Sequence, residues 1–337
     1  MLFIVVLAIV TFVSILLILP IFSRRNTATL NIKDKYVLIT GCDSGFGRET
    51  ALRLDKMGVC VLATCLTEEG EQSLRSVASE KLKTFQMDVT DPQQIEAVFF
   101  KVNQLLEGSS GLWGLVNNAG ILTVGPVEWL PLDAYKKVAD VNLWGLVDVT
   151  KTFLPLIKKA KGRIVIVSSI AGVISPQAFS PYCISKYGVE AFADALRREM
   201  RPFEVLVSVI EPGATRTPIL NDVLLCARLK QLWDNLSEEK QQEYGKGYLE
   251  NATKGFRDWC KSASKQVSRV IDAIVLPLTS RSPKKCYVIG QDAWQLKFLS
   301  HLPEVLQDFV LREFPFRVVV PSGRDLFEKS STNGSAH

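Results

Sequence analysis

Histidine is almost absent from this chain of 337 residues, which contains only His301 and His337. Histidine is the commonest metal ligand and the usual proton carrier near neutral pH, so neither a histidine-based metal centre nor a histidine acid–base site is expected. The seven cysteines form no C-x-x-C pair, as expected for reduced thiols in a cytosol-facing domain. We therefore expect no bound metal.

Strong charge patterning is also lacking, because the net charge is only +5 and basic residues are spread among acidic ones. This distribution argues against a nucleic-acid-binding surface. No internal repeat or low-complexity block interrupts the chain, and only residues 321–337 have the composition of a terminal tail.

One segment lacks charge altogether: residues 2–22, LFIVVLAIVTFVSILLILPIF, carry no charged side chain and match the length of a bilayer-spanning helix. A cleaved signal peptide is the alternative, but the segment has neither a basic start nor a small-x-small cleavage site. We expect a membrane anchor at 1–22 and a linker at 23–34. Arg24 and Arg25 follow the apolar run, which by the positive-inside rule places the remaining chain on the cytosolic side.

From Lys35 onward, short apolar runs rich in β-branched residues alternate with amphipathic segments. The runs expected to form strands are 36–40, 59–64, 82–88, 114–120, 162–169, 205–213 and 284–290. Helices are expected at 48–57, 93–106 and 132–159, and after Ser180. Continuous apolar strands separated by helices predict one α/β domain, residues 35–320, with a doubly wound, Rossmann-type parallel sheet of about seven strands and helices on both faces.

The first predicted strand runs into TGCDSGFGRE, in which Gly41, Gly45 and Gly47 precede a predicted helix. Glycines at this place allow the backbone to approach a pyrophosphate, and the helix start offers free N–H groups. A tight glycine turn without a ligand is the alternative. The position between a strand and a helix favours nucleotide binding.

A tyrosine and a lysine lie four residues apart in SPYCISKYGVEAF, at Tyr182 and Lys186. On a helix this spacing stacks the two side chains one turn apart, and a nearby cation lowers the pKa of a phenol. The alternative is an ordinary amphipathic helix with a core aromatic residue and a solvated lysine.

Further motifs lie in one order along the chain: MDV at 87–89, NNAG at 117–120, VNLWG at 141–145, VSS at 167–169 and EPG at 211–213. Together with the glycine turn and the Y-x-x-x-K pair, they resemble the short-chain dehydrogenase/reductase family. TGCDSGFG, GLWGLVNNAG and SPYCISKYGVEAF resemble the branch that holds retinol, 17β-hydroxysteroid and D-3-hydroxybutyrate dehydrogenases.

The resemblance implies roles for a catalytic set of Asn142, Ser169, Tyr182 and Lys186. Tyr182 would be the general acid/base, and Lys186 would lower its pKa and hold the nicotinamide ribose. Ser169 would bind the reacting oxygen, with Ser168 or a strand-capping role as alternatives. Asn142 would link the lysine through water to solvent, or be a helix-bend residue.

The resemblance also implies a nicotinamide cofactor. The residues it assigns to the cofactor, besides Tyr182 and Lys186, are Gly41, Asp43, Gly45, Phe46, Gly47, Thr64, Asp88, Val89, Asn118, Ala119, Gly120, Pro212, Gly213 and Thr217. Thr64 stands at the end of the second predicted strand, where an acid usually reads the ribose 2′-hydroxyl of NAD. No basic residue adjoins Thr64 and Asp43 adds negative charge, so we expect NAD rather than NADP.

A long segment, 219–260, separates the sixth predicted strand from the helix before the last one, and we expect it to form a substrate lid. Its apolar residues at mostly helical spacing are Leu220, Val223, Leu224, Leu225, Leu229, Leu232 and Trp233. With the anchor, they favour a lipophilic alcohol, a steroid or retinoid, over a short hydroxy acid. Arg216 and Arg228 keep D-3-hydroxybutyrate as an alternative.

The predicted anchor places this enzyme in the endoplasmic reticulum membrane, with a mitochondrial membrane as the alternative. A catalytically silent NAD-binding membrane scaffold is the rival function, although the complete catalytic set argues against it. The oligomeric state is open, with a homo-oligomer among the alternatives.

Overall fold

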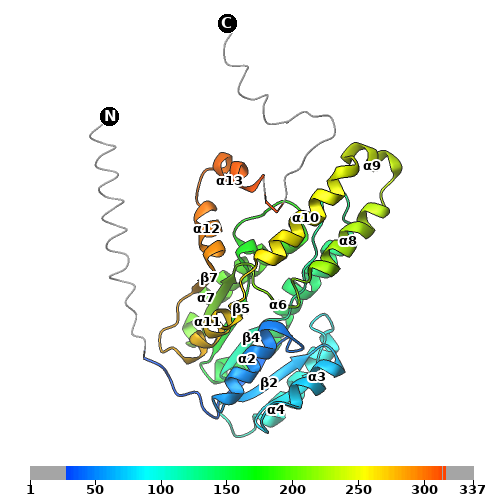
Figure 1. The fold of residues 1–337 in the computed structure, drawn as a ribbon. Helices are drawn as coiled ribbons and strands as arrows, with labels where there is room; N and C mark the ends of the chain where they lie inside the picture. The colour runs from blue at the N-terminus through cyan, green and yellow to red at the C-terminus, as the bar shows by residue number, and fades with distance from the viewer. Residues whose placement is uncertain (1–27, 313, 316–337) are drawn as a thin grey trace, which may run out of the picture.

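The computed structural model of the protein describes residues 28–312, 314 and 315. Its centre is a parallel sheet of seven strands in the order β3-β2-β1-β4-β5-β6-β7 (Figure 1). The strands are β1 Tyr36–Ile39, β2 Cys60–Cys65, β3 Lys83–Gln86, β4 Gly114–Asn117, β5 Arg163–Val167, β6 Leu206–Pro212 and β7 Cys286–Ile289. All seven lie within the segments expected from the sequence or within one residue of them, so the doubly wound prediction is confirmed.

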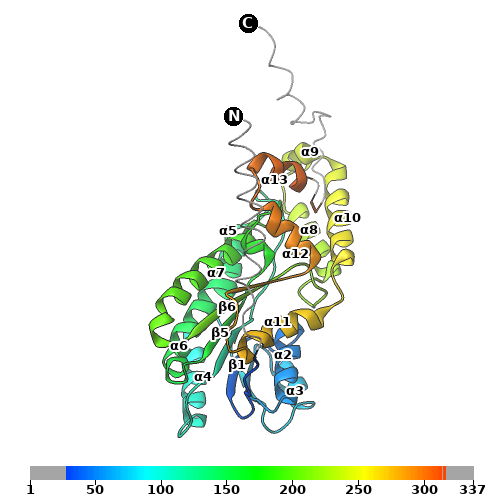
Figure 2. The same cartoon turned by 90° about the vertical axis from the view of Figure 1, so that its left-hand side faces the viewer.

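Helices cover both faces of the sheet (Figures 1 and 2). The helices are α2 Gly45–Lys56, α3 Glu68–Arg75, α4 Pro92–Leu105, α5 Leu132–Ala139, α6 Leu146–Lys159, α7 Ser180–Glu199, α8 Asp222–Asp234, α9 Glu238–Tyr244, α10 Lys246–Ser262, α11 Val267–Thr279, α12 Gln291–Leu299 and α13 Glu304–Leu311. Apolar residues of α4, α6 and α7 form one core against the sheet, and those of α2, α3 and α11 form the core on the other face. Burial on both faces explains why the strands are continuous apolar runs.

The order of the strands reverses between β1 and β4, which lie side by side. The chain moves outward from β1 to β3 and then returns to build the other half of the sheet from β4. In open sheets of this type, ligands bind beyond the carboxyl ends of the strands at such a reversal.

The prediction of a single helix at 132–159 is wrong, because a π-helical turn at Asp140–Gly145 separates α5 from α6. Within this turn, the Asn142 side chain binds both backbone groups of Ile121: its Oδ1 accepts from the N–H at 2.8 Å and its Nδ2 donates to the carbonyl at 2.9 Å. A Cβ on Gly145 would lie 2.5 Å from the Val89 carbonyl oxygen. Tertiary contacts therefore hold the wider turn, a common device near functional sites.

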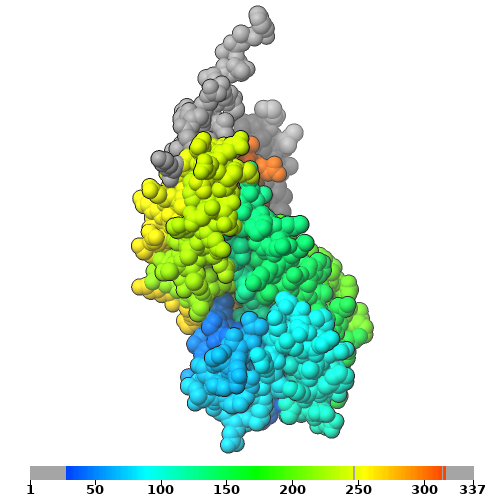
Figure 3. Space-filling model, turned by 90° about the vertical axis from the view of Figure 1, so that its right-hand side faces the viewer, coloured from blue at the N-terminus to red at the C-terminus, as the bar shows by residue number. Residues whose placement is uncertain are grey.

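Three helices, α8, α9 and α10, form a lobe beyond the carboxyl ends of the strands (Figures 1 and 3). They occupy the segment expected as a lid. Helices α12 and α13, which were not among the predicted elements, stand on the other side of this end of the molecule. Helix α3 was also missed.

Residues 28–34 run beside the end of α11, where the Leu30 N–H donates to the Thr279 carbonyl at 2.6 Å. Within the described residues, no helix is long and apolar enough to span a membrane. The predicted anchor at 1–22, residues 23–27 of the predicted linker and the tail at 321–337 lie outside them.

Candidate active site

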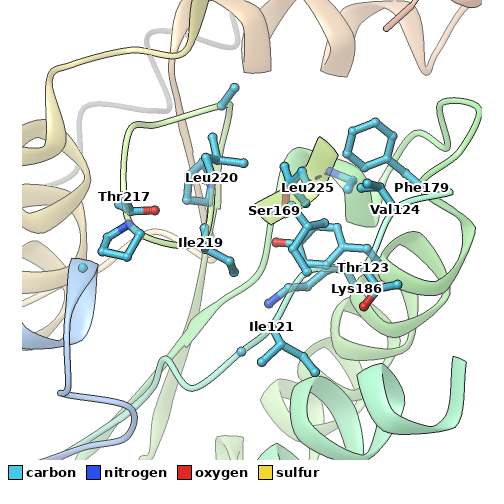
Figure 4. A pocket seen from close by; sticks show the side chains of 18 of the residues that line it. Ile121, Thr123, Val124, Ser169, Phe179, Lys186, Thr217, Ile219, Leu220 and Leu225 are labelled. Atoms are coloured by element: carbon cyan, nitrogen blue, oxygen red, sulfur yellow. Dashed lines mark hydrogen bonds between the residues drawn. The ribbon is translucent and has the colours of Figure 1, made fainter. Parts of the chain in front are cut away.

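A cavity of about 2350 Å³ opens at the carboxyl ends of the strands. It extends from the glycine turn after β1, past the ends of β4, β5 and β6, to the α8 side of the lobe. Figure 4 shows Ser169 and Lys186 on one wall, with Thr217 and Ile219 on the opposite wall. One continuous space therefore joins the predicted cofactor residues to the predicted lid.

The glycine turn has a conformation that side chains would obstruct. Gly41 and Gly45 have positive φ values of +69° and +60°, and a Cβ on Gly41 would lie 2.8 Å from the Ala119 Cα. A Cβ on Gly47 would lie 2.3 Å from the Gly41 carbonyl oxygen, so Gly47 supports the turn without lining the cavity. The turn leads into the N-terminus of α2, whose N-cap, Ser44, makes no side-chain capping bond. Free N–H groups at a helix start suit a pyrophosphate.

Asn118, which lines the cavity, holds the same turn from β4. Its Nδ2 donates to the carbonyls of Thr40 and Gly41 at 2.9 and 3.0 Å. The Thr40 hydroxyl accepts the N–H groups of Asn118 and Ala119 at 3.0 Å each. The NNAG motif thus fastens the end of β4 to the end of β1.

The end of β2 differs from the sequence expectation. Thr64 is fully buried and does not line the cavity, whereas Leu66 and Thr67 do. The Asp43 carboxylate reaches this place from the glycine turn, where it accepts the N–H groups of Leu66 at 2.8 Å and Thr67 at 2.9 Å. An acid is therefore present beside the end of β2, but it comes from the glycine turn.

The remaining predicted cofactor residues line the same cavity: Asp88, Val89, Gly120, Pro212, Gly213, Thr217 and Phe46. The Asp88 carboxylate accepts the Thr90 N–H at 2.8 Å, which orders the turn after β3. Gly213 is packed against Asp292, a residue that the sequence did not signal: the Asp292 Oδ2 accepts the Ala214 N–H at 2.7 Å. A Cβ on Gly213 would collide with that carboxylate.

Three of the four predicted catalytic residues line the cavity: Ser169, Tyr182 and Lys186. Helix α7 begins with Ser180 and Pro181, and places Tyr182 and Lys186 one turn apart. The Lys186 Nζ donates to the Val167 carbonyl at 2.9 Å and lies 5.6 Å from the centre of the Tyr182 ring. Ser169 lies two residues after the end of β5 and caps a short 3-10 helix, where its hydroxyl accepts the Ala171 N–H at 3.2 Å.

Burial governs the protonation of this pair. It raises the pKa of Tyr182 to about 12, against a hydrogen bond from Ser169 that lowers it. Burial also lowers the pKa of Lys186 to about 8, against the nearby Glu190 carboxylate, which raises it. Desolvation therefore sets the direction of the Tyr182 shift, whereas the sequence led us to expect a tyrosine pKa lowered by Lys186. That role of Lys186 stays a prediction.

Asn142, the fourth predicted residue, is fully buried and does not line the cavity. Besides holding Ile121, its Nδ2 donates to the Ser185 hydroxyl at 3.0 Å, and that hydroxyl donates to the Tyr182 carbonyl at 2.7 Å. These contacts agree with the helix-bend alternative and connect the loop after β4 to the start of α7. The predicted water link to Lys186 stays a prediction.

The far end of the cavity is largely apolar. Its apolar lining includes Leu122, Val124, Phe179, Ile219, Leu220, Leu224, Leu225 and Leu232. Of the two cations considered for a short acid, Arg228 lines this end and donates to the Leu122 carbonyl at 3.1 Å. Arg216 does not line the cavity and binds the Lys261 carbonyl.

Comparisons with known proteins agree with this geometry. Residues 35–225 match the family described as short chain dehydrogenase. Retinol dehydrogenase 16 of Rattus norvegicus is 45% identical over 86% of this chain and 92% of that protein. Mitochondrial D-beta-hydroxybutyrate dehydrogenase of the same species is 42% identical over 81% of this chain and 82% of that protein.

A solved short-chain dehydrogenase from Streptomyces avermitilis has the same fold, with a TM-score of 0.66 and 26% identity, over 83% of this chain and 96% of that one. Other chains of this fold have been solved with NADP and with NAD. The matched family, the close relatives and the shared fold lead to one conclusion: the chain belongs to the short-chain dehydrogenases and is an oxidoreductase of the alcohol dehydrogenase type.

Proposed function

We propose that this protein is a membrane-attached, NAD-dependent dehydrogenase that interconverts a bulky lipophilic alcohol, a steroid or retinoid, and its carbonyl compound. The observation that carries the proposal is the continuous cavity, which runs from the glycine turn past Tyr182 and Lys186 to an apolar end under α8. An alcohol whose hydroxyl reaches Tyr182 would have its apolar body in that end. Burial of an apolar body against such a lining contributes roughly 25 cal/mol per Å².

The proposed reaction moves a hydride and a proton from one alcohol. A bound nicotinamide would supply the hydride acceptor and, when oxidised, a positive charge that favours a nearby phenolate. The Tyr182 oxygen takes the hydroxyl proton as the carbonyl forms, and Ser169 holds the reacting oxygen. Lys186 provides the fixed positive charge behind Tyr182. Asn142 positions the helix start through Ser185.

The residues present fit a dinucleotide. The glycine turn leaves room where a Cβ would collide, and the N-terminus of α2 offers N–H groups without a side-chain cap. NAD is favoured because the Asp43 carboxylate stands beside Leu66 and Thr67, where a 2′-phosphate would meet negative charge.

The substrate class rests on the apolar end of the cavity and on the likeness to retinol dehydrogenase 16. A short hydroxy acid is the second candidate, supported by Arg228 at the cavity and by the likeness to D-beta-hydroxybutyrate dehydrogenase. The test compares kcat/KM on a 17β-hydroxysteroid, on retinol and on D-3-hydroxybutyrate in one membrane preparation. A clear preference for the hydroxy acid overturns the lipophilic assignment, and NAD binding without turnover of any alcohol favours a scaffold.

Membrane attachment is supported by the uncharged segment 2–22 and by an exposed apolar surface on α12 and α13. That surface consists of Trp294, Phe298, Val305, Leu306, Phe309 and Val310. In Figure 1, α12 and α13 lie on the left-hand side of the molecule, as does the start of the described chain. The exposed Asn235 in the sequon Asn-Leu-Ser tests the topology: endoglycosidase-sensitive mass would place the domain in the lumen and contradict a cytosolic location.

A further inference from the structure

A carboxyl group lies one helical turn after the predicted catalytic lysine. Glu190 follows Lys186 by four residues on α7, so the two side chains leave the helix on the same face. Glu190 is half-buried and does not line the cavity. No motif drew attention to it, because a lone glutamate in an amphipathic helix is usually solvated.

Gly172 marks how closely this carboxyl group is packed. A Cβ on Gly172 would lie 3.0 Å from each of three atoms: Glu190 Cγ, Ser168 Oγ and the Lys186 carbonyl oxygen. Glu190 Oε1 and Ser168 Oγ are both buried, and the Ser168 hydroxyl favours the charged form of the Glu190 carboxyl group.

The charged groups around Glu190 come from three further elements: β6, β7 and α12. Glu211 on β6 is buried, and the Lys297 Nζ on α12 donates to both of its carboxylate oxygens at 2.6 Å. The Cys286 thiol on β7 also donates to Glu211, at 2.9 Å. The negative charge of Glu211 is therefore already compensated by the Lys297 ammonium. Among the described residues, Lys186 by contrast hydrogen-bonds a neutral carbonyl, and Glu190 is the anion whose charge raises its pKa.

Protonation of Glu190 falls in the physiological range. Burial raises the pKa of Glu190 to about 7; the Ser168 hydroxyl, Lys297 and Lys186 oppose this effect, whereas Glu211 adds to it. The carboxyl group is thus mainly neutral near pH 6 and mainly charged near pH 8. Over the same range, burial drives Lys186 toward its neutral form, because its pKa is about 8.

We propose that Glu190 is a positioning residue for the reaction: its carboxylate keeps the Lys186 ammonium charged beside Tyr182 as the pH rises through neutrality. This inference rests on the proposed role of Lys186. Glu190 would thus affect the pH range of activity from outside the cavity, without contacting the substrate or the cofactor.

The first test measures kcat of Glu190→Gln against the unchanged protein from pH 6 to pH 8.5, with whichever alcohol is turned over. Near pH 6 both proteins carry a neutral side chain at 190, so the ratio of their kcat values should approach one. Near pH 8 the ratio should reach about fivefold and rise further toward pH 8.5, because a lysine pKa lowered by about one unit from about 8 leaves about a tenth of the amine charged in place of about half. Glu190→Asp should restore part of the high-pH activity.

Glu199→Gln is the matched control, since Glu199 is an exposed glutamate at the end of the same helix. It removes an equal charge and should leave the pH profile unchanged. A ratio that stays constant from pH 6 to 8.5, whatever its size, would mean that Glu190 has a structural role only and would overturn the proposal.

A second measurement needs no substrate. Competitive acetylation of the full-length protein, followed by mass spectrometry of the peptide with Lys186, reports the pKa of that amine. We expect Glu190→Gln to lower it by about one unit and Glu199→Gln to leave it unchanged. If the pKa of Lys186 is unchanged in Glu190→Gln, the inference is refuted even if the proposed substrate is correct. A lowered value supports it even if no tested alcohol is oxidised.

Discussion

The Asp43 carboxylate accepts two hydrogen bonds from Thr67, one from the backbone N–H at 2.9 Å and one from the hydroxyl at 2.8 Å. This contact joins the glycine turn to the chain that follows β2. Under the proposed function, it places a negative charge beside the end of β2, where the ribose 2′ group of a bound dinucleotide would lie.

Leu66→Arg should shift cofactor preference from NAD toward NADP. Leu66 is 54% exposed and lines the cavity beside Asp43, so a guanidinium there could bind a 2′-phosphate. The measurement is kcat/KM for both cofactors, with Leu66→Gln as the uncharged control. Thr64→Arg should instead destabilise the fold, because Thr64 is fully buried. Higher efficiency of the unchanged protein with NADP would refute the assignment of NAD.

Tyr182→Phe should lower kcat by about 10²–10⁴-fold while NAD binding remains nearly unchanged, because only the proton-accepting oxygen is lost. Tyr187→Phe is the matched control, since Tyr187 lies on the same helix and is 43% exposed. Steady-state kinetics and fluorescence titration with NADH separate the two effects. Substantial residual turnover in Tyr182→Phe would contradict the proton-transfer role.

Asn142→Ala should lower the free energy of unfolding by about 2–4 kcal/mol. The substitution leaves both backbone groups of Ile121 and the Ser185 hydroxyl without the Asn142 side chain. Asn103→Ala, an exposed asparagine on α4, should change stability by less than about 1 kcal/mol. Denaturant unfolding of both variants measures the difference. If Asn142→Ala is as stable as the control but inactive, the residue acts in proton transfer and not through structure.

Lys297→Met should lower the free energy of unfolding by about 3–5 kcal/mol, because it leaves the buried Glu211 carboxylate without its cation. Burial opposes the charge of Lys297, but the carboxylate raises its pKa overall. The charge of Lys297 therefore stabilises the fold fully below the usual titration range of lysine, and this contribution is lost as the pH rises through its raised pKa.

The double variant Lys297→Met with Glu211→Leu should recover most of the lost stability, since no buried charge remains. Lys230→Met breaks an exposed ion pair with Asp234 and should cost no more than about 1 kcal/mol. Thermal denaturation at neutral pH compares the stability of Lys297→Met, the double variant and Lys230→Met. Equal losses for Lys230→Met and Lys297→Met would show that burial gives the second pair no special weight.

Local sequence patterns were sufficient to predict the sheet and helix α7, which carries Tyr182 and Lys186. Continuous runs such as RIVIV at Arg163–Val167 are buried on both faces, so their composition alone indicates a central parallel strand. Helix α3 was missed because EEGEQSLR buries only Leu74 and has too little apolar periodicity to signal a helix. The π-helical turn was missed because Asn142 and Ile121, whose hydrogen bonds hold it, are 21 residues apart.

By itself, the sequence determined the family, the order of the strands along the chain, and the spacing of Tyr182 and Lys186, because these depend on periodicity and on residues close along the chain. Only the tertiary structure decided which groups surround them. It buried Thr64 and brought Asp43 to the end of β2 instead, and it brought the Glu211–Lys297 pair near Glu190. Charge and burial at these places come from segments far apart in the chain, and they set the protonation and binding properties of the site.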